Sequence, residues 1–183
     1  MQILSDAQRA TLLEAARAAV VAHLSGAPMP RHVDAAAPLG IPRGAFVTIR
    51  LAGELRGCVG ITLPTDPLLE SVMRCAVSSA TEDPRFPAMS LDQIGDARFE
   101  ISVLSPPTVL PRASLPRMGS DGLIVTRGRR RGILLPQVAV EQGWSAMQLL
   151  EAVCTKAGLA PDAWREADTL IEVFTAEVFS DPP

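Results

Sequence analysis

The run LRGCVG, residues 55–60, is the part of the chain best suited to chemistry, because it places the thiol of Cys58 two residues from the guanidinium of Arg56. Successive side chains of an extended strand alternate between its two faces. Arg56 and Cys58 are therefore predicted to share one face of a strand, and Leu55 is predicted to lie on the other face. A cation and a thiol on one face form a candidate site for an anionic ligand.

Two glycines, Gly57 and Gly60, stand inside the same run. A glycine within a strand usually marks a bulge, or a place where another backbone or a ligand comes close. Both glycines are therefore candidate ligand-binding positions. Their spacing matches neither a Walker loop nor a dinucleotide fingerprint, so a phosphate-binding loop is not expected.

Two interpretations of Cys58 follow from its residue type and its neighbours. A thiolate becomes reactive where positive charge or backbone N–H groups stabilise it, and Arg56 supplies positive charge. In the first interpretation, Cys58 is a nucleophile or a redox centre, and Arg56 holds an anionic substrate or the thiolate itself. In the second, Cys58 packs inside a sheet, as free cysteines often do, and Arg56 ties loops together through carboxylates.

A second candidate pair, Asp83 and Arg85, flanks Pro84 after a predicted helix. The proline disfavours helical backbone at Asp83 and fixes the local geometry. Polar side chains on a rigid loop often take part in binding, so Asp83 and Arg85 are candidate ligand-binding residues. The alternative is an Asp–Arg pair that only holds the turn together.

Composition and spacing narrow the function classes. The net charge of -3 provides no overall positive field for phosphates, so nucleic acid is not an expected partner. The basic run at 127–131 is interpreted as a solvated hairpin tip, because no aromatic residues interleave it. Neither a CxxC nor an HExxH spacing occurs, and no metal or cofactor is expected. His23 is interpreted as a surface histidine at a helix end, while His32 and Asp34 fall in a proline-rich loop or flap.

A cytoplasmic location is expected. No apolar run approaches the roughly 20 residues that a membrane helix requires, and the N-terminus has no secretory signal pattern. The three cysteines are odd in number and widely spaced, unlike a disulfide framework. Cys75, inside a predicted helix, is interpreted as a small buried hydrophobe.

Hydrophobic periodicity and turn residues predict an α+β fold, and no linker or repeat divides the chain, so one domain over residues 1–183 is expected. Capping-box spacings begin helices at Ser5 and Ser145, and Asp66 is the expected cap of another helix. The predicted elements are a helix ending at Gly26, a hairpin of strands 46–51 and 55–61, a helix over 66–81, a strand over 99–103, a hairpin of strands 122–126 and 132–135, helices over 136–143 and 145–157, and a final strand over 170–179.

Several separated runs resemble the motifs of one family, and they occur in the family's order. LRGCVG resembles that family's LRGCIG, and DPRFPA, which begins at Asp83, resembles its DPRFPP. The other matching runs are ISVLSPP from Ile101, GLIV from Gly122, LLPQVA from Leu134 and KAGL from Lys156. Over nearly its whole length, the chain is similar to the AMMECR-type domain family, whose bacterial members are called AmmeMemoRadiSam system protein A.

The resemblance implies an antiparallel or mixed sheet with flanking helices, in a larger lobe with both termini and a smaller lobe, with the motif residues around a cleft. It also implies two partners, a Memo-type protein and a radical S-adenosylmethionine (SAM) enzyme. Asp121 is a further candidate ligand-binding residue. Many members have histidine at this position, so the chain keeps only a carboxylate there, and a mechanism that needs a histidine base or metal ligand at this position is weakened. Two functions remain open: an enzyme that uses Cys58 and Arg56 on a small anionic or nucleotide-like substrate, and a non-catalytic module with a docking groove for a partner protein.

Overall fold

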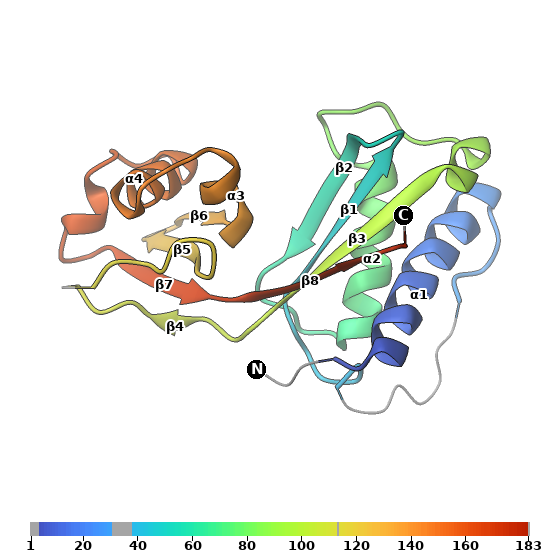
Figure 1. Ribbon diagram of the computed structural model, residues 1–183, viewed down its shortest axis with the longest axis horizontal. Coiled ribbons are helices and arrows are strands. Elements are labelled where there is room, and N and C mark those ends of the chain that lie inside the picture. Colours follow the sequence, from blue (N-terminus) through green and yellow to red (C-terminus); the bar gives the residue numbers. More distant parts are fainter. Residues whose placement is uncertain (1–3, 31–37, 113, 183) are drawn as a thin grey trace. The chain divides into compact units, whose positions relative to one another are not determined.

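The computed structural model describes residues 4–30, 38–112 and 114–182, which fold into two compact units (Figure 1). The first unit comprises Met1–Leu104 and Glu177–Pro183, and the second comprises Ser105–Ala176. Each unit has its own four-stranded sheet, and the strand pairings are antiparallel. The predicted α+β class with flanking helices is therefore confirmed. His32 and Asp34 lie outside the described residues.

The first unit packs two helices on one face of its sheet (Figure 1). The sheet has the strand order β2-β1-β3-β8, in which β2 is an edge strand. A 3-10 helix at Leu91–Gly95 precedes β3. The elements are α1 (Asp6–Ser25), β1 (Ala45–Leu51), β2 (Glu54–Ile61), α2 (Leu68–Thr81), β3 (Ala97–Leu104) and β8 (Ala176–Ser180).

Helix α1 begins and ends where its capping residues predict. The Ser5 hydroxyl accepts the N–H of Gln8, and the Gln8 side chain accepts the N–H of Ser5, which completes the capping box. Gly26 ends the helix in the left-handed region at a φ of 70°, which glycine adopts without steric cost. The apolar stripe of α1 includes Leu12 and Val20, both fully buried, and each such side chain contributes about 2 kcal/mol.

The predicted cap of α2 is wrong. Its N-cap residue is Pro67, and the side chain of Asp66 makes no capping hydrogen bond. The Asp66 carboxylate pairs instead with the guanidinium of Arg74, which lies further along α2. An aspartate can cap a helix only when its carboxylate turns back to the first N–H groups, and here the arginine competes for it.

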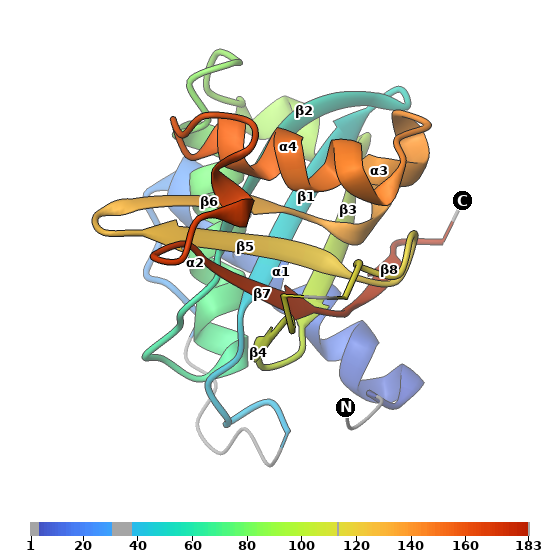
Figure 2. The same ribbon diagram turned by 90° about the vertical axis from the view of Figure 1, so that its left-hand side faces the viewer.

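The second unit lays its helices over one face of a small sheet (Figure 2). The strand order is β4-β7-β5-β6, and the core includes Leu123, Leu149 and Val153. The predicted hairpin with its basic tip is confirmed, and Gly128 turns it at a φ of 58°. The elements are β4 (Thr108–Val109), β5 (Gly122–Arg127), β6 (Arg130–Leu134), α3 (Pro136–Glu141), α4 (Ala146–Lys156), a 3-10 helix (Ala163–Arg165) and β7 (Leu170–Phe174).

The single final strand predicted over 170–179 is wrong, because two strands occupy it. β7 pairs in the sheet of the second unit and β8 in the sheet of the first. Thr175 separates them and makes two hydrogen bonds with Ser105. The Ser105 N–H donates to the Thr175 carbonyl, and the Thr175 N–H donates to the Ser105 hydroxyl. Strand-forming residues on both sides of Thr175 give no sign of this change of partner.

Among the described residues, none of the helices combines the length and apolar character needed to cross a bilayer. The same residues contain no group of three or more His, Cys, Asp or Glu side chains placed to hold a metal ion. His23 is exposed near the end of α1, where the sequence predicted it.

Candidate functional site

A β-bulge at Arg56 interrupts the pairing of β2 with β1. Gly57 lies opposite Ile49, and Leu55 lies opposite Arg50, so Arg56 has no partner residue on β1. An extra residue of this kind bends the strand and increases its twist locally. The bulge confirms one of the two features that a glycine inside this strand predicts.

The bulge changes which side chains share a face with Cys58. Cys58 lies opposite Thr48 and Leu55 lies opposite Arg50. Because Thr48 and Arg50 are two residues apart on a regular strand, they share a face, and their partners share it too. Leu55 therefore lies on the face of Cys58, and the prediction that it lies on the other face is wrong. Strict alternation fails here because the unpaired residue shifts the register by one.

The two glycines of the run are required by close packing. A Cβ atom on Gly57 would lie 1.9 Å from the carbonyl oxygen of Ser79 in α2. A Cβ atom on Gly60 would lie 2.2 Å from a ring carbon of Phe46 and 2.6 Å from the carbonyl oxygen of Ala45. At Gly57 the helix backbone therefore approaches the strand more closely than any side chain would allow, as the sequence predicted for a glycine in a strand.

Ser79 reaches from α2 into the β1–β2 ladder. Its hydroxyl donates to the carbonyl of Val47 at 2.7 Å and accepts the N–H of Val59 at 2.9 Å. The residue is 1% exposed, so water cannot replace either bond. Ser79 thus holds the helix against the strand at the position where Gly57 gives it room.

Ser79→Ala is expected to lower the free energy of unfolding by about 2 kcal/mol, because a backbone donor and a backbone acceptor would lose their partner inside the core. Ser78→Ala is the matched control, since among the described residues the Ser78 hydroxyl donates only to the exposed Glu82 carboxylate, and its effect should stay within about 0.5 kcal/mol. Urea unfolding followed by circular dichroism measures both. Equal midpoints for the two variants would contradict the bridging role of Ser79.

The carboxylate of Asp83 joins the two sequence motifs of the first unit. It accepts the N–H of Cys58 at 2.9 Å, across 25 residues of sequence. It also accepts the Nε of Arg85 at 2.9 Å and the Nη2 of Arg85 at 2.7 Å. The Asp83 side chain is 3% exposed. The Asp–Arg pair therefore does more than hold its own turn, because it also fixes the backbone of β2 at Cys58.

The charge of Asp83 is stabilised in this position. Hydrogen bonds from the Arg85 side chain, and then from the backbone N–H groups of Cys58 and Arg85, hold the pKa of the Asp83 carboxyl well below its usual range, against the opposing effect of burial. Arg85 also donates from Nη2 to the carbonyl of Cys58 at 3.4 Å. Both backbone groups of Cys58 are thus held by this one pair.

The three thiols differ in their surroundings. Cys58 is partly exposed, and the hydroxyl of Thr48 lies 3.3 Å from its Sγ. Cys75 and Cys154 are buried, and burial raises the pKa of the Cys75 thiol to about 11 and also raises the pKa of Cys154. The interpretation of Cys75 as a buried hydrophobe is confirmed. Of the three cysteines, Cys58 is the one that a reagent in solution can reach directly.

Arg56, the bulged residue, carries a guanidinium nitrogen without a partner. Its Nη1 is buried and makes no hydrogen bond within the described part of the chain. A buried donor of a charged group costs free energy until an acceptor satisfies it. Among the described residues, the Nη1 of Arg56 is therefore a buried donor that an acceptor could still satisfy.

Asp121, the candidate from the second unit, is held by a neighbouring arginine. Its carboxylate, in a residue 4% exposed, accepts the backbone N–H of Arg117 at 2.8 Å and its Nη2 at 2.8 Å. Burial acts to raise the pKa of the Asp121 carboxyl, but the hydrogen bonds and the charge of Arg117 together lower it. The carboxylate therefore stays ionised and paired within its own loop.

Two site residues were missed by sequence reasoning. Thr48 and Ser79 touch the Cys58 strand, yet each has an ordinary place in the pattern of its own element. The signal for Ser79 is a small polar residue on the buried stripe of α2, opposite a glycine in the strand. Thr48 offers no comparable signal, because threonine is common in strands.

Comparison with known proteins places the chain in a family. The AMMECR1 family model matches residues 13–179. A protein of Methanothermobacter thermautotrophicus is 42% identical, over 97% of this chain and 96% of its own length. The protein MK0488 of Methanopyrus kandleri is 41% identical, over 93% of this chain and 86% of its own length. The crystal structure of the uncharacterised protein PH0010 from Pyrococcus horikoshii matches with a TM-score of 0.84 at 38% identity, over 93% of this chain and 89% of that one. On the family match and these relatives, this chain belongs to the AMMECR1 family.

Proposed function

We propose that this protein is an enzyme that uses the Cys58 thiol on a small anionic substrate held by Arg56. The observation that carries the proposal is the buried Nη1 of Arg56, which lacks a partner among the described residues two positions before a partly exposed thiol. An anionic group of a substrate would satisfy that nitrogen and bring its reacting carbon to the strand that carries Cys58.

The surroundings of Cys58 support a nucleophilic role. The Thr48 hydroxyl, 3.3 Å from Sγ, can donate a hydrogen bond to a thiolate. Asp83 and Arg85 hold the N–H and the carbonyl of Cys58, so the thiol sits on a fixed backbone. In the proposed step, Sγ forms a bond to an electrophilic carbon, the leaving group departs with the bonding electrons, and the thiol proton passes to solvent.

A non-catalytic docking module is the second candidate, and one observation favours it. Gly57, Gly60 and Asp83 each have a packing or hydrogen-bonding role that needs no ligand. On this candidate the LRGCVG run preserves a surface for a partner protein, and Cys58 has no chemical role. A Memo-type protein and a radical SAM enzyme are the partners proposed on family resemblance for either function.

Thiol labelling separates the two candidates. With iodoacetamide at neutral pH, Cys58 is expected to react faster than a free cysteine in a short peptide, whereas Cys75 and Cys154 should react at least about 100-fold more slowly than Cys58 because burial protects them. Mass spectrometry of the digested protein reports all three thiols in one sample, so the buried pair serves as an internal control.

The same assay tests Arg56. Arg56→Gln removes a positive charge two residues before Cys58 on the same strand, and it should slow the labelling of Cys58 about threefold. Arg129→Gln, at the exposed tip of the β5–β6 hairpin, changes the net charge equally and should leave the rate unchanged. A Cys58 that reacts no faster than the peptide, in both the parent protein and Arg56→Gln, would favour the docking module.

A further inference from the structure

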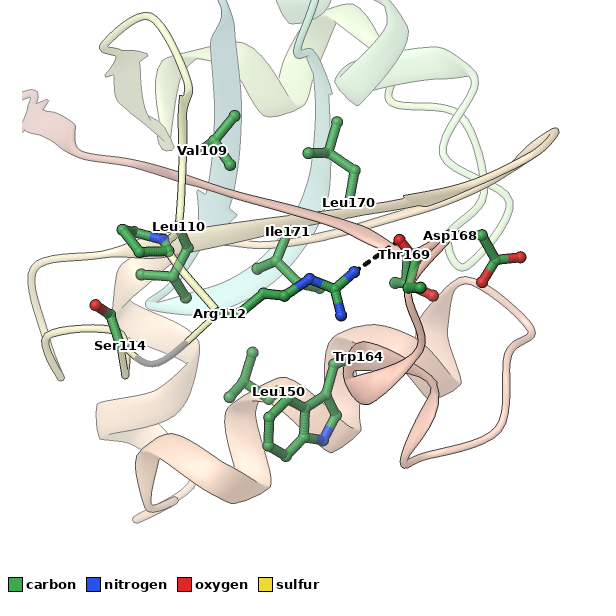
Figure 3. Close-up of a pocket in the computed structure, with 12 residues that line it drawn as sticks. Val109, Leu110, Arg112, Ser114, Leu150, Trp164, Asp168, Thr169, Leu170 and Ile171 are labelled. Carbon is green, nitrogen blue, oxygen red and sulfur yellow. Dashed lines mark hydrogen bonds between the residues drawn. The ribbon is translucent and has the colours of Figure 1, made fainter.

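A pocket of about 240 Å³ lies within the second unit and shares no residue with the Cys58 site (Figure 3). Its walls come from the chain segment after β4, from α4, from the 3-10 helix and from the segment that enters β7. Apolar side chains dominate these walls, with Leu110, Leu150 and Ile171 among them. A concave site with this lining suits the apolar body of a small molecule.

Arg112 brings a positive charge to the pocket. Its guanidinium donates to the main-chain carbonyls of Arg165 at 3.3 Å, Glu166 at 3.1 Å and Ala167 at 2.7 Å. Figure 3 shows the side chain extended across the pocket to this segment. Carbonyl oxygens carry only partial charge, so these bonds fix the position of the guanidinium without neutralising it.

Among the described residues that line the pocket, the one carboxylate does not pair with Arg112. Asp168 pairs with Arg127 at 2.8 Å, and its side chain is 64% exposed. In Figure 3 the Asp168 carboxylate lies on the far side of its segment from the Arg112 guanidinium. Within the described residues that line the pocket, the charge of Arg112 therefore has no carboxylate partner.

A buried hydroxyl in the same wall also lacks a partner. Thr169 is 7% exposed, and its Oγ1 makes no hydrogen bond within the described residues. It stands two residues after Ala167, whose carbonyl holds Arg112. A buried hydroxyl without a partner costs free energy, and native structures usually satisfy it with a protein group, a water or a ligand.

We propose that this pocket binds a small carboxylic acid with an apolar body. The carboxylate accepts hydrogen bonds from Arg112 and Thr169, and the apolar body lies against Leu110, Leu150 and Ile171, beside the ring of Trp164. The Arg112 residue is exposed, so water solvates its guanidinium; a neutral apolar molecule would gain nothing from that charge, and a purely polar anion would leave the apolar walls unfilled. The site is independent of the chemistry proposed for Cys58, because every residue of it belongs to the second unit.

Two tryptophans make the binding test direct. Both tryptophans pack against the hydrophobic core of the second unit, but Trp164 lines the pocket and Trp144 does not. In a nitrogen–proton correlation spectrum, phenylacetate should shift the indole signal of Trp164 saturably, with a dissociation constant of about 1 mM or lower, and should leave that of Trp144 in place. Phenylacetamide, the neutral analogue, should bind at least about tenfold more weakly. Hexanoate and indole-3-acetate extend the probe set.

Three variants locate the binding. Arg112→Gln should weaken phenylacetate about tenfold and Thr169→Val about fivefold, while Arg129→Gln should bind like the parent protein. Thr169→Val keeps the side-chain volume, so it tests the binding site even if Arg112→Gln does not fold. The proposal is overturned if none of the three acids shifts Trp164 saturably, if phenylacetamide binds as tightly as phenylacetate, or if neither pocket variant binds more weakly than Arg129→Gln.

Discussion

Gly57→Ala should destabilise the first unit by about 3 kcal/mol or more, or prevent it from folding. The added Cβ would lie 1.9 Å from the carbonyl oxygen of Ser79 and 2.8 Å from its carbonyl carbon. Both atoms belong to the backbone of α2, so no side-chain rotation can relieve the overlap. The helix would have to move off the strand and lose the hydrogen bonds of the Ser79 hydroxyl with Val47 and Val59. Urea unfolding followed by circular dichroism would show the loss as a lower midpoint.

Gly95→Ala is the matched control for this experiment. Gly95 ends the 3-10 helix of the same unit, its φ is not positive, and a Cβ built on it would meet nothing within 4 Å. Its effect should stay within about 0.5 kcal/mol. If Gly57→Ala unfolds at the same urea concentration as Gly95→Ala, then α2 does not approach β2 as closely as the structure indicates.

The sequence predicted that the strand around Gly57 has an irregular feature, but it did not predict where the bulge lies. A glycine inside a strand pattern predicts a bulge or a close backbone approach, and this strand has both. The position of the bulge at Arg56 could not be predicted, because a bulge depends on how β1 pairs with β2 rather than on the residues of β2 alone. Because the prediction did not include the bulge, its register was off by one residue before Arg56, and it placed Leu55 on the wrong face of the strand.

Local signals carried most of the fold. The capping boxes at Ser5 and Ser145 and the two hairpins each depend on residues within a few positions of one another, and all four were predicted correctly. The strand over 170–179 failed because its division at Thr175 depends on Ser105, which is 70 residues away. Long-range partners are not encoded in periodicity.

The residues of the second-unit pocket illustrate the same limit. Arg112 and Thr169 have no motif around them, and they come together only through the main chain of Arg165, Glu166 and Ala167. A lone arginine or threonine in a sequence is most simply a surface residue. Only the folded chain reveals that three main-chain carbonyls hold Arg112, and that the Thr169 hydroxyl is buried without a partner among the described residues.

Asp83→Asn should lower the free energy of unfolding by about 2 kcal/mol at neutral pH, because the amide keeps the shape of the side chain but loses its charge and one acceptor toward Arg85. The side chain is 3% exposed, so water cannot replace the charge-assisted bonds. The loss should also free the backbone of Cys58, whose N–H donates to this carboxylate at 2.9 Å. In this variant the rate of thiol labelling at Cys58 should therefore change, and the melting temperature should fall.

The pH dependence of this effect has a definite sign. Hydrogen bonds from Arg85 hold the pKa of the folded Asp83 carboxyl below that of the unfolded chain. As pH falls below about 5, the unfolded chain takes up the proton first, so the stabilising contribution is complete above that pH and is lost progressively in more acidic solution. The stability difference between the parent protein and Asp83→Asn should accordingly be largest from about pH 5 to 8 and should shrink below about pH 4.

A matched variant and a double-mutant cycle assign the effect to the ion pair. Asp96→Asn removes an exposed carboxylate of the same unit and should change the free energy of unfolding by no more than about 0.5 kcal/mol, both at about pH 3 and at about pH 7. Arg85→Gln should cost nearly as much as Asp83→Asn, since it leaves the Asp83 carboxylate buried with fewer donors. The double variant should then cost less than the sum of the two, with a coupling of about 2 kcal/mol. Additive costs, or a difference from the parent protein that is the same at pH 3 and pH 7, would show that Asp83 does not hold the Cys58 strand through its charge.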